Sequence, residues 1–451
     1  MRLSDFHSHV GQGEFTECLS GRSRGHVRRA QAKRDNHPGS AIVGLRIQAD
    51  AHHHLIVPDN PIIPYIEGDG IGREIWAAAE PVIHAAVDKA FQGMKKIEFL
   101  ELLFGETSFH TSDQRLEEDV LSRIREYRVA IKGPLATPVG RGIRSLDARI
   151  RQGLDLHTCI RPLRYYPPVP SPVKHPEKVD IVVFRENTED LYAGIEWDAR
   201  SDEARSLINI LKSRMNCSIS DTCAIGIKPI SQEGTRRLVI RAVQYALDHD
   251  RASVTLMHKG DIMKYTEGGF RKWGYRAAVE TFGDRVLTEE QLWSGYEGVV
   301  PQGRVVIKDR LADMMFAQML LGPEQFDVIA CPNLNGDYIS DAVAAQVGGL
   351  GISPGANIGD ECAVFEPTHG TAPDIAGKDM ANPCAIILSG ATMLDHLGWT
   401  SAAVLIRKGV AGALASGKVT RDLASNIPGG EAVSCSQFGR NIVAQIKAAN
   451  L

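Results

Sequence analysis

The sequence lacks several features that would place it in particular classes of protein. It has only eight cysteines, at positions 18, 159, 217, 223, 331, 362, 384 and 435, and no close pair has the spacing of a zinc site. Scattered cysteines of this kind indicate reduced thiols in a cytoplasmic protein. No hydrophobic run approaches the length of a membrane span. The formal net charge of −4 also argues against nucleic acid as the main partner.

Residues 1–58 lack the apolar periodicity of the rest of the chain. They carry several arginines and the tract His52-His53-His54, but not the apolar core of a signal peptide. We predict that residues 1–58 form a disordered N-terminal extension, or that the start codon is placed too early. A transit peptide and a metal-binding histidine tract are the alternatives.

The remaining chain alternates between predicted strands and predicted helices, and the chain of 451 residues is long enough for two or three domains. Strands are expected at 61–66, 97–103, 128–131, 157–163, 180–184, 223–227, 253–258, 303–307 and 326–331. Helices are expected at 117–126, 231–248, 268–282 and 309–320. This alternation predicts an α/β fold with parallel or mixed sheets flanked by helices.

The first predicted strand leads into a glycine-rich turn, Glu67-Gly68-Asp69-Gly70-Ile71-Gly72, and then into an amphipathic helix. The turn resembles the opening of a nucleotide-binding fold, but its glycines do not have the spacing G-x-G-x-x-G. No acidic residue ends a second strand at the usual distance either. The fold is therefore predicted to differ from a standard Rossmann fold.

The stretch after the last predicted strand offers two candidate metal ligands. The strand ends at Cys331, Asn335-Gly336 breaks it, and Asp337 opens a predicted helix. Asp337 and Asp341 are four residues apart, so a helix places both carboxylates on one face. Two hard oxygen ligands suit Mg²⁺ or Mn²⁺ better than zinc. A capping Asp and a solvated Asp are the alternative, but the glycine-rich loop that follows favours a functional site.

Several arginines near predicted strand ends form a candidate clamp for a substrate with more than one carboxylate, because Arg binds carboxylate through two hydrogen bonds. They are Arg144, Arg149, Arg151, Arg161, Arg164 and Arg185. Tyr192 is a candidate proton donor, and Lys259 is a candidate general base, general acid or oxyanion partner. Asp313, in another predicted helix, is a third candidate metal ligand. Surface arginines, a packing tyrosine and a solvated lysine are the corresponding alternatives.

Four blocks of sequence together resemble the isocitrate and isopropylmalate dehydrogenase family of metal-dependent β-decarboxylating dehydrogenases. The blocks are Tyr65–Gly72, Arg185-Glu186-Asn187, Asn335–Asp341 and His369-Gly370-Thr371-Ala372-Pro373. The resemblance extends from about Asn60 to the C-terminus. The loop Gly142-Ile143-Arg144-Ser145-Leu146 is similar to that of the bacterial homodimeric isocitrate dehydrogenases, whereas isopropylmalate enzymes have an apolar patch there.

The resemblance implies a domain organisation and a homodimer with shared active sites. A large cofactor-binding domain would comprise residues 59–156 and 348–451, and a small domain residues 157–190 and 223–347. Residues 191–222 would form a clasp-like dimerisation segment. The dimer would be obligatory for activity, because each site would take side chains from both subunits.

The resemblance also implies roles for individual residues in converting isocitrate to 2-oxoglutarate, a step of the tricarboxylic acid cycle. Isocitrate would be bound by Ser145, Asp147, Arg151, Arg161 and Arg185. Mg²⁺ or Mn²⁺ would be held by Asp337, Asp341 and Asp313 of the partner subunit. The partner's Lys259 would assist removal of the hydroxyl proton, and Tyr192 would protonate the enol after the intermediate, oxalosuccinate, loses CO₂. Ser145 matches a serine that is phosphorylated in some bacterial members.

The predicted cofactor is NAD. NADP-using relatives have Lys and Tyr after the Thr-Ala-Pro segment, whereas this chain has Asp374 and Ile375, and Gly322 stands where a partner arginine is expected. A carboxylate at position 374 would repel a 2′-phosphate by roughly 4 kcal/mol at about 4 Å and an effective dielectric of about 20. Arg421 is the feature that favours NADP. The residues that would bind the cofactor are Ala136, His369, Gly370, Thr371, Ala372, Pro373, Asp374, Ile375, Asn382, Arg421 and Ser425.

Three residues depart from the family pattern. Asp147 and Asp261 stand where Asn is common, and Ala136 replaces a hydroxyl residue of the cofactor loop. A carboxylate at position 147 would weaken substrate binding unless it is protonated or paired with an Arg. Two other functions stay open: a dehydrogenase of another 3-substituted malate, such as isopropylmalate or homoisocitrate, and a non-catalytic regulatory subunit. Ser145 argues against the first, and the retention of Lys259, Tyr192 and the three metal-ligand aspartates argues against the second.

Overall fold

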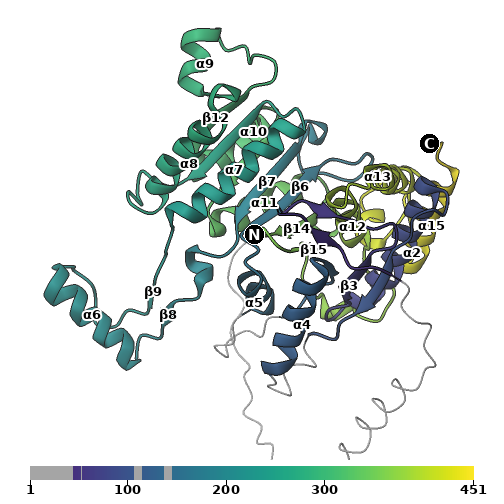
Figure 1. The fold of residues 1–451 in the computed structure, drawn as a ribbon, viewed down its shortest axis with the longest axis horizontal. Helices are drawn as coiled ribbons and strands as arrows, with labels where there is room; N and C mark the ends of the chain where they lie inside the picture. The colour runs from purple at the N-terminus through teal and green to yellow at the C-terminus, as the bar shows by residue number, and fades with distance from the viewer. Residues whose placement is uncertain (1–43, 52, 106–113, 137–144, 451) are drawn as a thin grey trace, which may run out of the picture. The chain divides into compact units, whose positions relative to one another are not determined.

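The computed structural model describes residues 44–51, 53–105, 114–136 and 145–450 (Figure 1). Its strands are β1 Gln48–Ala49, β2 Leu55–Ile56, β3 Ile62–Ile66, β4 Glu98–Glu101, β5 Val129–Lys132, β6 Thr158–Arg164, β7 Asp180–Glu186, β8 Glu196–Trp197, β9 Ile225–Gly226, β10 Ser253–His258, β11 Val286–Thr288, β12 Val305–Leu311, β13 Val328–Cys331, β14 Pro354–Ile358, β15 Ala363–Pro367, β16 Lys418–Val419 and β17 Glu431–Ala432. Its α-helices are α2 Gly72–Phe91, α4 Gln114–Tyr127, α5 Leu146–Gly153, α6 Asp202–Met215, α7 Gln232–Asp248, α8 Glu267–Phe282, α9 Glu289–Tyr296, α10 Ala312–Leu321, α11 Asn333–Gln346, α12 Cys384–His396, α13 Thr400–Ala415, α14 Arg421–Ala424 and α15 Cys435–Ala448. The predicted extension up to residue 43, His52 and the predicted substrate-loop residues Gly142, Ile143 and Arg144 lie outside the described residues.

The main sheet is mixed. In the described part of the chain it has eleven strands, in the order β11-β12-β10-β13-β7-β6-β14-β15-β5-β3-β4. Neighbours pair in parallel except at the centre, where β7–β6, β6–β14 and β14–β15 are antiparallel. Two parallel halves are therefore joined through an antiparallel centre. This arrangement confirms the predicted α/β fold with a mixed sheet flanked by helices.

Helices cover both faces of the half that contains β7, β10 and β13 (Figure 1). Successive residues of a strand point to opposite faces. Phe184 of β7 therefore packs in one core cluster with Leu238 of α7, whereas its neighbour Val183 packs in another with Ile339 of α11. Strands covered on both faces read as continuous apolar runs, which explains why the sequence Val328-Ile329-Ala330-Cys331 predicts a strand.

The carboxyl ends of parallel neighbours meet at one edge of a sheet, where ligands of open α/β folds bind. One such group of strands is β15, β5 and β3, and the other is β12, β10, β13 and β7. The loops after the first group carry Ala136 and the predicted cofactor residues from His369 to Ile375. The segments after the second group carry Lys259, Asp313 and α11. The sheet thus gathers most of the predicted site residues at two sets of strand ends.

Two predicted helix starts are wrong. α11 begins at Asn333, so Asn335 and Gly336 lie inside a helix rather than in a strand-breaking turn. A Cβ atom at position 336 would come within 2.6 Å of the Arg185 side chain, so the glycine permits α11 to pack closely on β7. The helix α10 begins at Ala312, because β12 continues through Leu311.

Regular structure begins before residue 59. Strands β1 and β2 pair antiparallel, with Gln48 opposite Ile56, and Ile47 belongs to the core. Near the predicted clasp segment, β8 and β9 pair antiparallel, and α6 lies between them in the chain. None of the helices in the described ranges is long and apolar enough to cross a membrane.

Candidate functional site

Asp337 and Asp341 lie one turn apart on α11, and both contact arginines of the sheet centre. Arg185 of β7 donates a hydrogen bond to Asp337 Oδ1. Arg161 of β6 donates to Asp341 Oδ1 at 3.0 Å, and its Nη2 lies 3.9 Å from Asp337 Oδ1. The register of the antiparallel pair β6–β7, with Cys159 opposite Arg185, directs both arginines to the face that α11 covers. The structure thus brings four of the predicted site residues together.

Burial and the arginines have opposing effects on these carboxylates. Burial raises the pKa of Asp337, but Arg185 and the hydrogen bond from Tyr192 outweigh burial and lower it below its usual value. At Asp341 burial prevails over Arg161, and the pKa is raised. Burial, reinforced by Arg161, lowers the pKa of Arg185. The site therefore presents cations and anions at one point, which suits a polycarboxylate that binds together with a divalent cation.

Tyr192 lies in the short 3₁₀-helix Asp190–Ala193 beside α11. Its hydroxyl donates to Asp337 Oδ2 at 2.5 Å, and the Arg185 guanidinium lies 4.7 Å from the ring centroid. Burial and the hydrogen bond to Asp337 raise the pKa of the phenol. Tyr192 is therefore protonated at neutral pH, the state that a proton donor requires.

A second group of charges surrounds Lys132, which ends β5 and is only 2% exposed. Lys132 Nζ lies 2.7 Å from Asp147 Oδ1 and 2.8 Å from Glu366 Oε2. Arg151 Nη2 donates to Glu366 Oε1 at 2.6 Å. Burial raises the pKa of Glu366, but Lys132 and Arg151 outweigh it and hold the pKa far below its usual value. Asp147 is thus paired with a cation, although its partner is Lys132 and not an arginine.

Lys132 and Glu366 were not predicted as site residues. Lys132 ends β5 after Val129-Ala130-Ile131, and Glu366 follows Ala363-Val364-Phe365 as the next-to-last residue of β15. A charged residue in such a strand is the available signal, because a buried charge requires a partner. Ser145, another predicted substrate residue, directly precedes α5, and its carbonyl accepts a hydrogen bond from Arg149 N at 3.1 Å.

Lys259 follows β10 and contacts two aspartates of its own chain. Its Nζ lies 2.8 Å from Asp313 Oδ1 and 3.1 Å from Asp261 Oδ2. Both hydrogen bonds raise the pKa of Lys259, and the bond to Asp313 has the larger effect. In the described residues no group of three or more His, Cys, Asp or Glu side chains could hold a metal ion, so one chain does not gather Asp313 with the two α11 aspartates.

The predicted cofactor residues lie on loops that contact one another through their backbones. Ile71 N donates to Thr371 O at 2.9 Å. Ala136 N donates to Asp69 Oδ2 at 2.7 Å. Gly70 has a φ of +57°, and a Cβ atom there would come within 2.0 Å of the Thr371 carbonyl oxygen. The glycine-rich turn therefore packs directly on the loop His369–Pro373, and the loops follow the neighbouring strands β3, β5 and β15.

His369 offers an acceptor at this surface. Its Nδ1 lies 2.9 Å from Gly370 O, so Nδ1 carries the proton. Its Nε2 is buried and has no hydrogen-bond partner among the described residues. Burial lowers the pKa of His369, which keeps the ring neutral at physiological pH. His369 Nε2 is consequently able to accept a hydrogen bond from a bound ligand.

The remaining predicted cofactor residues lie on or near α14. Asn382 Nδ2 donates to Asp422 Oδ2 at 3.0 Å, which joins the segment before α12 to α14. Arg421 is the first residue of α14, and Ser425 Oγ donates to its carbonyl at 2.9 Å. The hydrogen bond between Asn382 and Asp422 therefore holds Arg421 and Ser425 near the start of α12.

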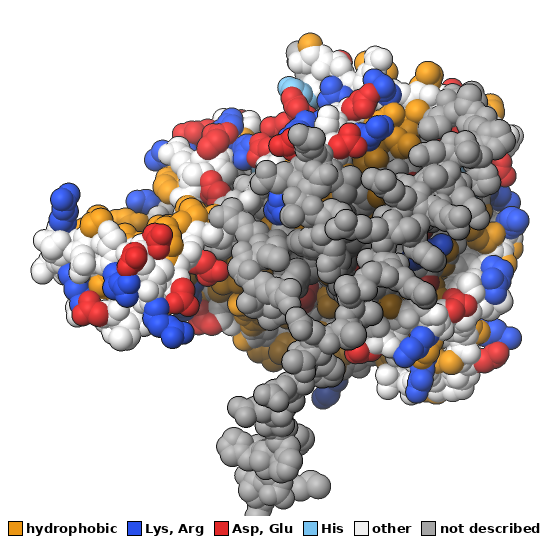
Figure 2. Space-filling view, turned by 90° about the horizontal axis from the view of Figure 1, so that it is seen from below, with side chains coloured by type: hydrophobic (Ala, Val, Ile, Leu, Met, Phe, Trp, Pro, Cys, Tyr) orange, Lys and Arg blue, Asp and Glu red, His pale blue; other side chains and the backbone are white. Residues whose placement is uncertain are grey.

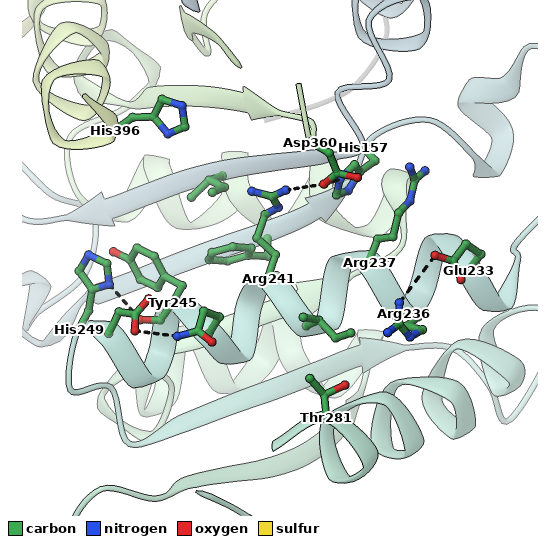
Figure 3. A pocket seen from close by; sticks show the side chains of 15 residues that line it. His157, Glu233, Arg236, Arg237, Arg241, Tyr245, His249, Thr281, Asp360 and His396 are labelled. Atoms are coloured by element: carbon green, nitrogen blue, oxygen red, sulfur yellow. Dashed lines mark hydrogen bonds and ion pairs between the residues drawn. The ribbon is translucent and has the colours of Figure 1, made fainter. Parts of the chain in front are cut away.

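A cavity of about 720 Å³ lies against β6 and β7 on the face of the sheet opposite to α11 (Figure 3). Ile160 and Phe184 line it, and their chain neighbours Arg161 and Arg185 point to the α11 face. Arg241 on the cavity wall donates to Asp360 Oδ1 at 3.1 Å. None of the predicted site residues that the structure describes lines this cavity. The cavity is therefore separate from the candidate active site.

Comparison with known proteins identifies the family to which the chain belongs. The family model described as isocitrate/isopropylmalate dehydrogenase matches residues 62–442, and the chain belongs to this family.

Individual relatives cover most of the chain. It is 52% identical over 394 residues to the isocitrate dehydrogenase (NADP) of Archaeoglobus fulgidus, with 87% of this chain and 95% of the relative covered. It is 54% identical over 397 residues to that of Coxiella burnetii, with 87% and 93% covered. The solved structure of isocitrate dehydrogenase from Methylococcus capsulatus is similar with a TM-score of 0.71 and 34% identity, and 86% of this chain and 99% of that chain are covered.

The predicted preference for NAD is wrong, because these relatives carry NADP in their names. Two structural features weaken the electrostatic reason for expecting NAD. Asp374 is exposed to water, which screens its charge. Lys378 Nζ also donates to the Asp374 carbonyl at 2.7 Å. The ammonium group of Lys378 therefore adds a positive charge close to the backbone of Asp374.

Proposed function

We propose that this protein is an isocitrate dehydrogenase that catalyses the metal-dependent oxidative decarboxylation of isocitrate to 2-oxoglutarate and CO₂ with reduction of NADP. The observation that carries the proposal is the convergence of Arg161, Arg185, Asp337, Asp341 and Tyr192 beside the N-terminal half of α11. The names and the high identity of the relatives support both the substrate and the cofactor.

Isocitrate carries three carboxylates, and the chain offers three buried or half-buried arginines for them. Arg161 and Arg185 contact Asp337 and Asp341, and Arg151 contacts Glu366. In the proposed complex, substrate carboxylates take the places of the two α11 aspartates as partners of Arg161 and Arg185. Each charge-assisted hydrogen bond of this kind contributes about 1.5–3 kcal/mol. The α11 aspartates are then free to bind a cation.

Asp337 and Asp341 fit a Mg²⁺ or Mn²⁺ ion, because both supply oxygen donors from one helix face and Asp337 has a lowered pKa. Asp313 of the partner subunit is the proposed third ligand. When bound, the ion acts as a Lewis acid that stabilises negative charge on the substrate oxygen.

Two side chains are proposed to handle protons. Lys259 of the partner subunit assists removal of the hydroxyl proton. In the chain itself, hydrogen bonds to Asp313 and Asp261 raise the pKa of Lys259. If Asp313 bound another partner instead, that pKa would fall and a larger fraction of Lys259 would be neutral and able to accept a proton. Tyr192 remains protonated and delivers its proton to the enol carbon.

The loops around Gly70, Ala136 and Thr371 are the proposed cofactor surface. NADP would supply the hydride acceptor when bound there. His369 Nε2 would accept a hydrogen bond from the cofactor, and Arg421 and Lys378 are the proposed cations for the 2′-phosphate.

A homodimer with shared sites is part of the proposal, as is its division into a large domain, a small domain and the clasp segment 191–222. Hydrophobic side chains are visible at the end that carries α6 (Figure 2). In and near the clasp segment, Met215 is 63% exposed, Leu191 45%, Ile210 41% and Ile227 40%. Such exposed apolar side chains are a candidate subunit interface.

The experiment that tests the proposed function is a steady-state assay of the purified protein with isocitrate, isopropylmalate and homoisocitrate. Each acid is offered with NADP or NAD, with and without Mg²⁺. We expect NADPH formation with isocitrate only, and only with the metal. Faster turnover of another malate, or no turnover of any acid, would refute the proposal. Sedimentation measures the oligomeric state in the same buffer.

A further inference from the structure

Beneath the candidate site lies a buried group of charges, Lys228, Asp190 and Glu267, which we call the buried triad. The side chains of Asp190 and Glu267 are 1% and 0% exposed, and that of Lys228 is 16% exposed. Lys228 Nζ forms an ion pair with Asp190 Oδ1 and another, at 3.0 Å, with Glu267 Oε1. One ammonium group therefore balances two carboxylates that water does not reach.

Asp190 ties the segment of Tyr192 to α11. Its Oδ1 accepts from Leu191 N at 2.8 Å, and its Oδ2 accepts from Leu334 N at 3.0 Å. Leu334 lies in the first turn of α11, where backbone N–H groups have no partner within the helix. Asp190 therefore fixes two chain segments whose side chains, Tyr192 and Asp337, meet above it.

Glu267, the first residue of α8, ties the segment of Lys259 to the same helix. Its Oε2 accepts from the backbone N–H of Lys259 and from Asn335 Nδ2 at 3.0 Å. The Glu267 carboxylate thus holds the backbone of Lys259 and also the side chain of Asn335, which lies two residues before Asp337. Through Lys228, the two carboxylates connect the proton-transfer residues Tyr192 and Lys259.

We propose that Lys228 is a positioning residue for the reaction, which aligns Tyr192 and α11 through Asp190 and aligns Lys259 through Glu267. The inference rests on the proposed function. In the proposed homodimer Lys259 serves the partner's site, so each triad also connects the two active sites of the dimer.

The physical reason is the cost of two neighbouring buried carboxylates without a cation. If the ammonium is removed, one carboxyl group must take up a proton or turn towards water. Either change weakens a backbone N–H acceptor at Leu334 or at Lys259. Among the described residues, the hydrogen bonds of Arg161, Arg185 and Arg151 go to other partners than the triad. Removal of the triad cation should therefore affect substrate affinity less than proton transfer.

The test is the variant Lys228→Met in the full-length enzyme. We expect kcat to fall by about 10- to 100-fold, which is the typical effect of losing a residue that orients a metal-binding side chain. The KM for isocitrate should change by less than about threefold, because that pattern marks an interaction made mainly in the transition state. The solvent deuterium isotope effect on kcat should increase, since proton transfer becomes slower. Lys228→Arg keeps the charge and should restore most of kcat.

The matched control is Lys95→Met, which removes another partly buried lysine with an aspartate partner, Asp59, at 3.3 Å. It should leave kcat and the isotope effect unchanged. A kcat of Lys228→Met equal to that of the wild type, or a loss that falls on KM alone, would overturn the inference.

A second measurement does not depend on turnover or on the folding of the methionine variant. Hydrogen exchange of the Leu334 and Lys259 amides is compared between Lys228→Gln and the wild type. We expect faster exchange at both amides and unchanged exchange in α12. Unchanged exchange at Leu334 and Lys259 would overturn the inference, whereas inactivity of the wild type on isocitrate would overturn only the proposed function.

Discussion

The variant Lys132→Met tests the charge group beside α5 most directly. Lys132 is buried between Asp147 and Glu366, at 2.7 and 2.8 Å. Removing one member of a buried ion pair costs about 3–5 kcal/mol, because it leaves an uncompensated charge. In the variant, Arg151 would still contact Glu366, and Asp147 is able to turn towards water. We therefore expect the free energy of unfolding to fall by an amount near the lower end of this range, about 3 kcal/mol.

The loss should also depend on pH in a defined direction. Against burial, Lys132 and Arg151 depress the pKa of Glu366. The stability that Glu366 contributes is therefore present above its unfolded-state pKa, about 4.3, and is lost as pH falls through the lower folded-state pKa. In Lys132→Met the folded-state pKa of Glu366 rises. The gap between the folded-state and unfolded-state pKa values of Glu366 therefore narrows. The destabilisation of Lys132→Met relative to the wild type should then be largest near neutral pH and should shrink as the pH falls towards 4.

The assay is urea unfolding of the wild type, Lys132→Met, Glu366→Gln and the double variant between pH 4 and pH 8. In this cycle the coupling energy of two contacting residues should be about 1–3 kcal/mol. Lys178→Met, which breaks an exposed pair with Glu324, is the control and should have little effect. A coupling energy below about 0.5 kcal/mol would refute the reasoning.

Three further predictions concern the reaction and its ligands. Tyr192→Phe should lower kcat by about 10²- to 10⁴-fold with little change in isocitrate KM, since it removes only the proton donor; a KM effect alone would contradict this role. Asp147→Asn should lower the KM for isocitrate about two- to fivefold, because Lys132 would keep one carboxylate partner and gain positive potential; a raised KM would show that Asp147 itself assists binding. Chelation with EDTA should abolish turnover while circular dichroism stays unchanged, and Mn²⁺ should restore it; activity that survives chelation would remove the metal from the mechanism.

The family and the fold class could be predicted, and candidate site residues could be named, because their signals are local. Asp337 and Asp341 are one turn apart, and the glycine-rich turn and the His369–Pro373 loop are continuous in the sequence. Apolar runs covered on both faces predict strands such as β13. The helix start at Asn333 could not be predicted from the neighbouring residues alone. A glycine at position 336 suggests a turn, but it is required because the Arg185 side chain, from a distant strand, packs closely against the helix there.

Tertiary structure alone decided which charges share a partner. Lys132, Asp147 and Glu366 come from three separate segments of the chain, and so do Lys228, Asp190 and Glu267. The sequence contains each of these residues but not the distances between them, and the Coulomb energy depends on distance and burial. The wrong expectation of NAD has the same origin, since the sequence shows neither the exposure of Asp374 nor the position of the Lys378 ammonium group. The sequence by itself determined the family, the fold class and the residue types of the site, whereas their electrostatic environment follows from packing, because only packing sets distance and dielectric.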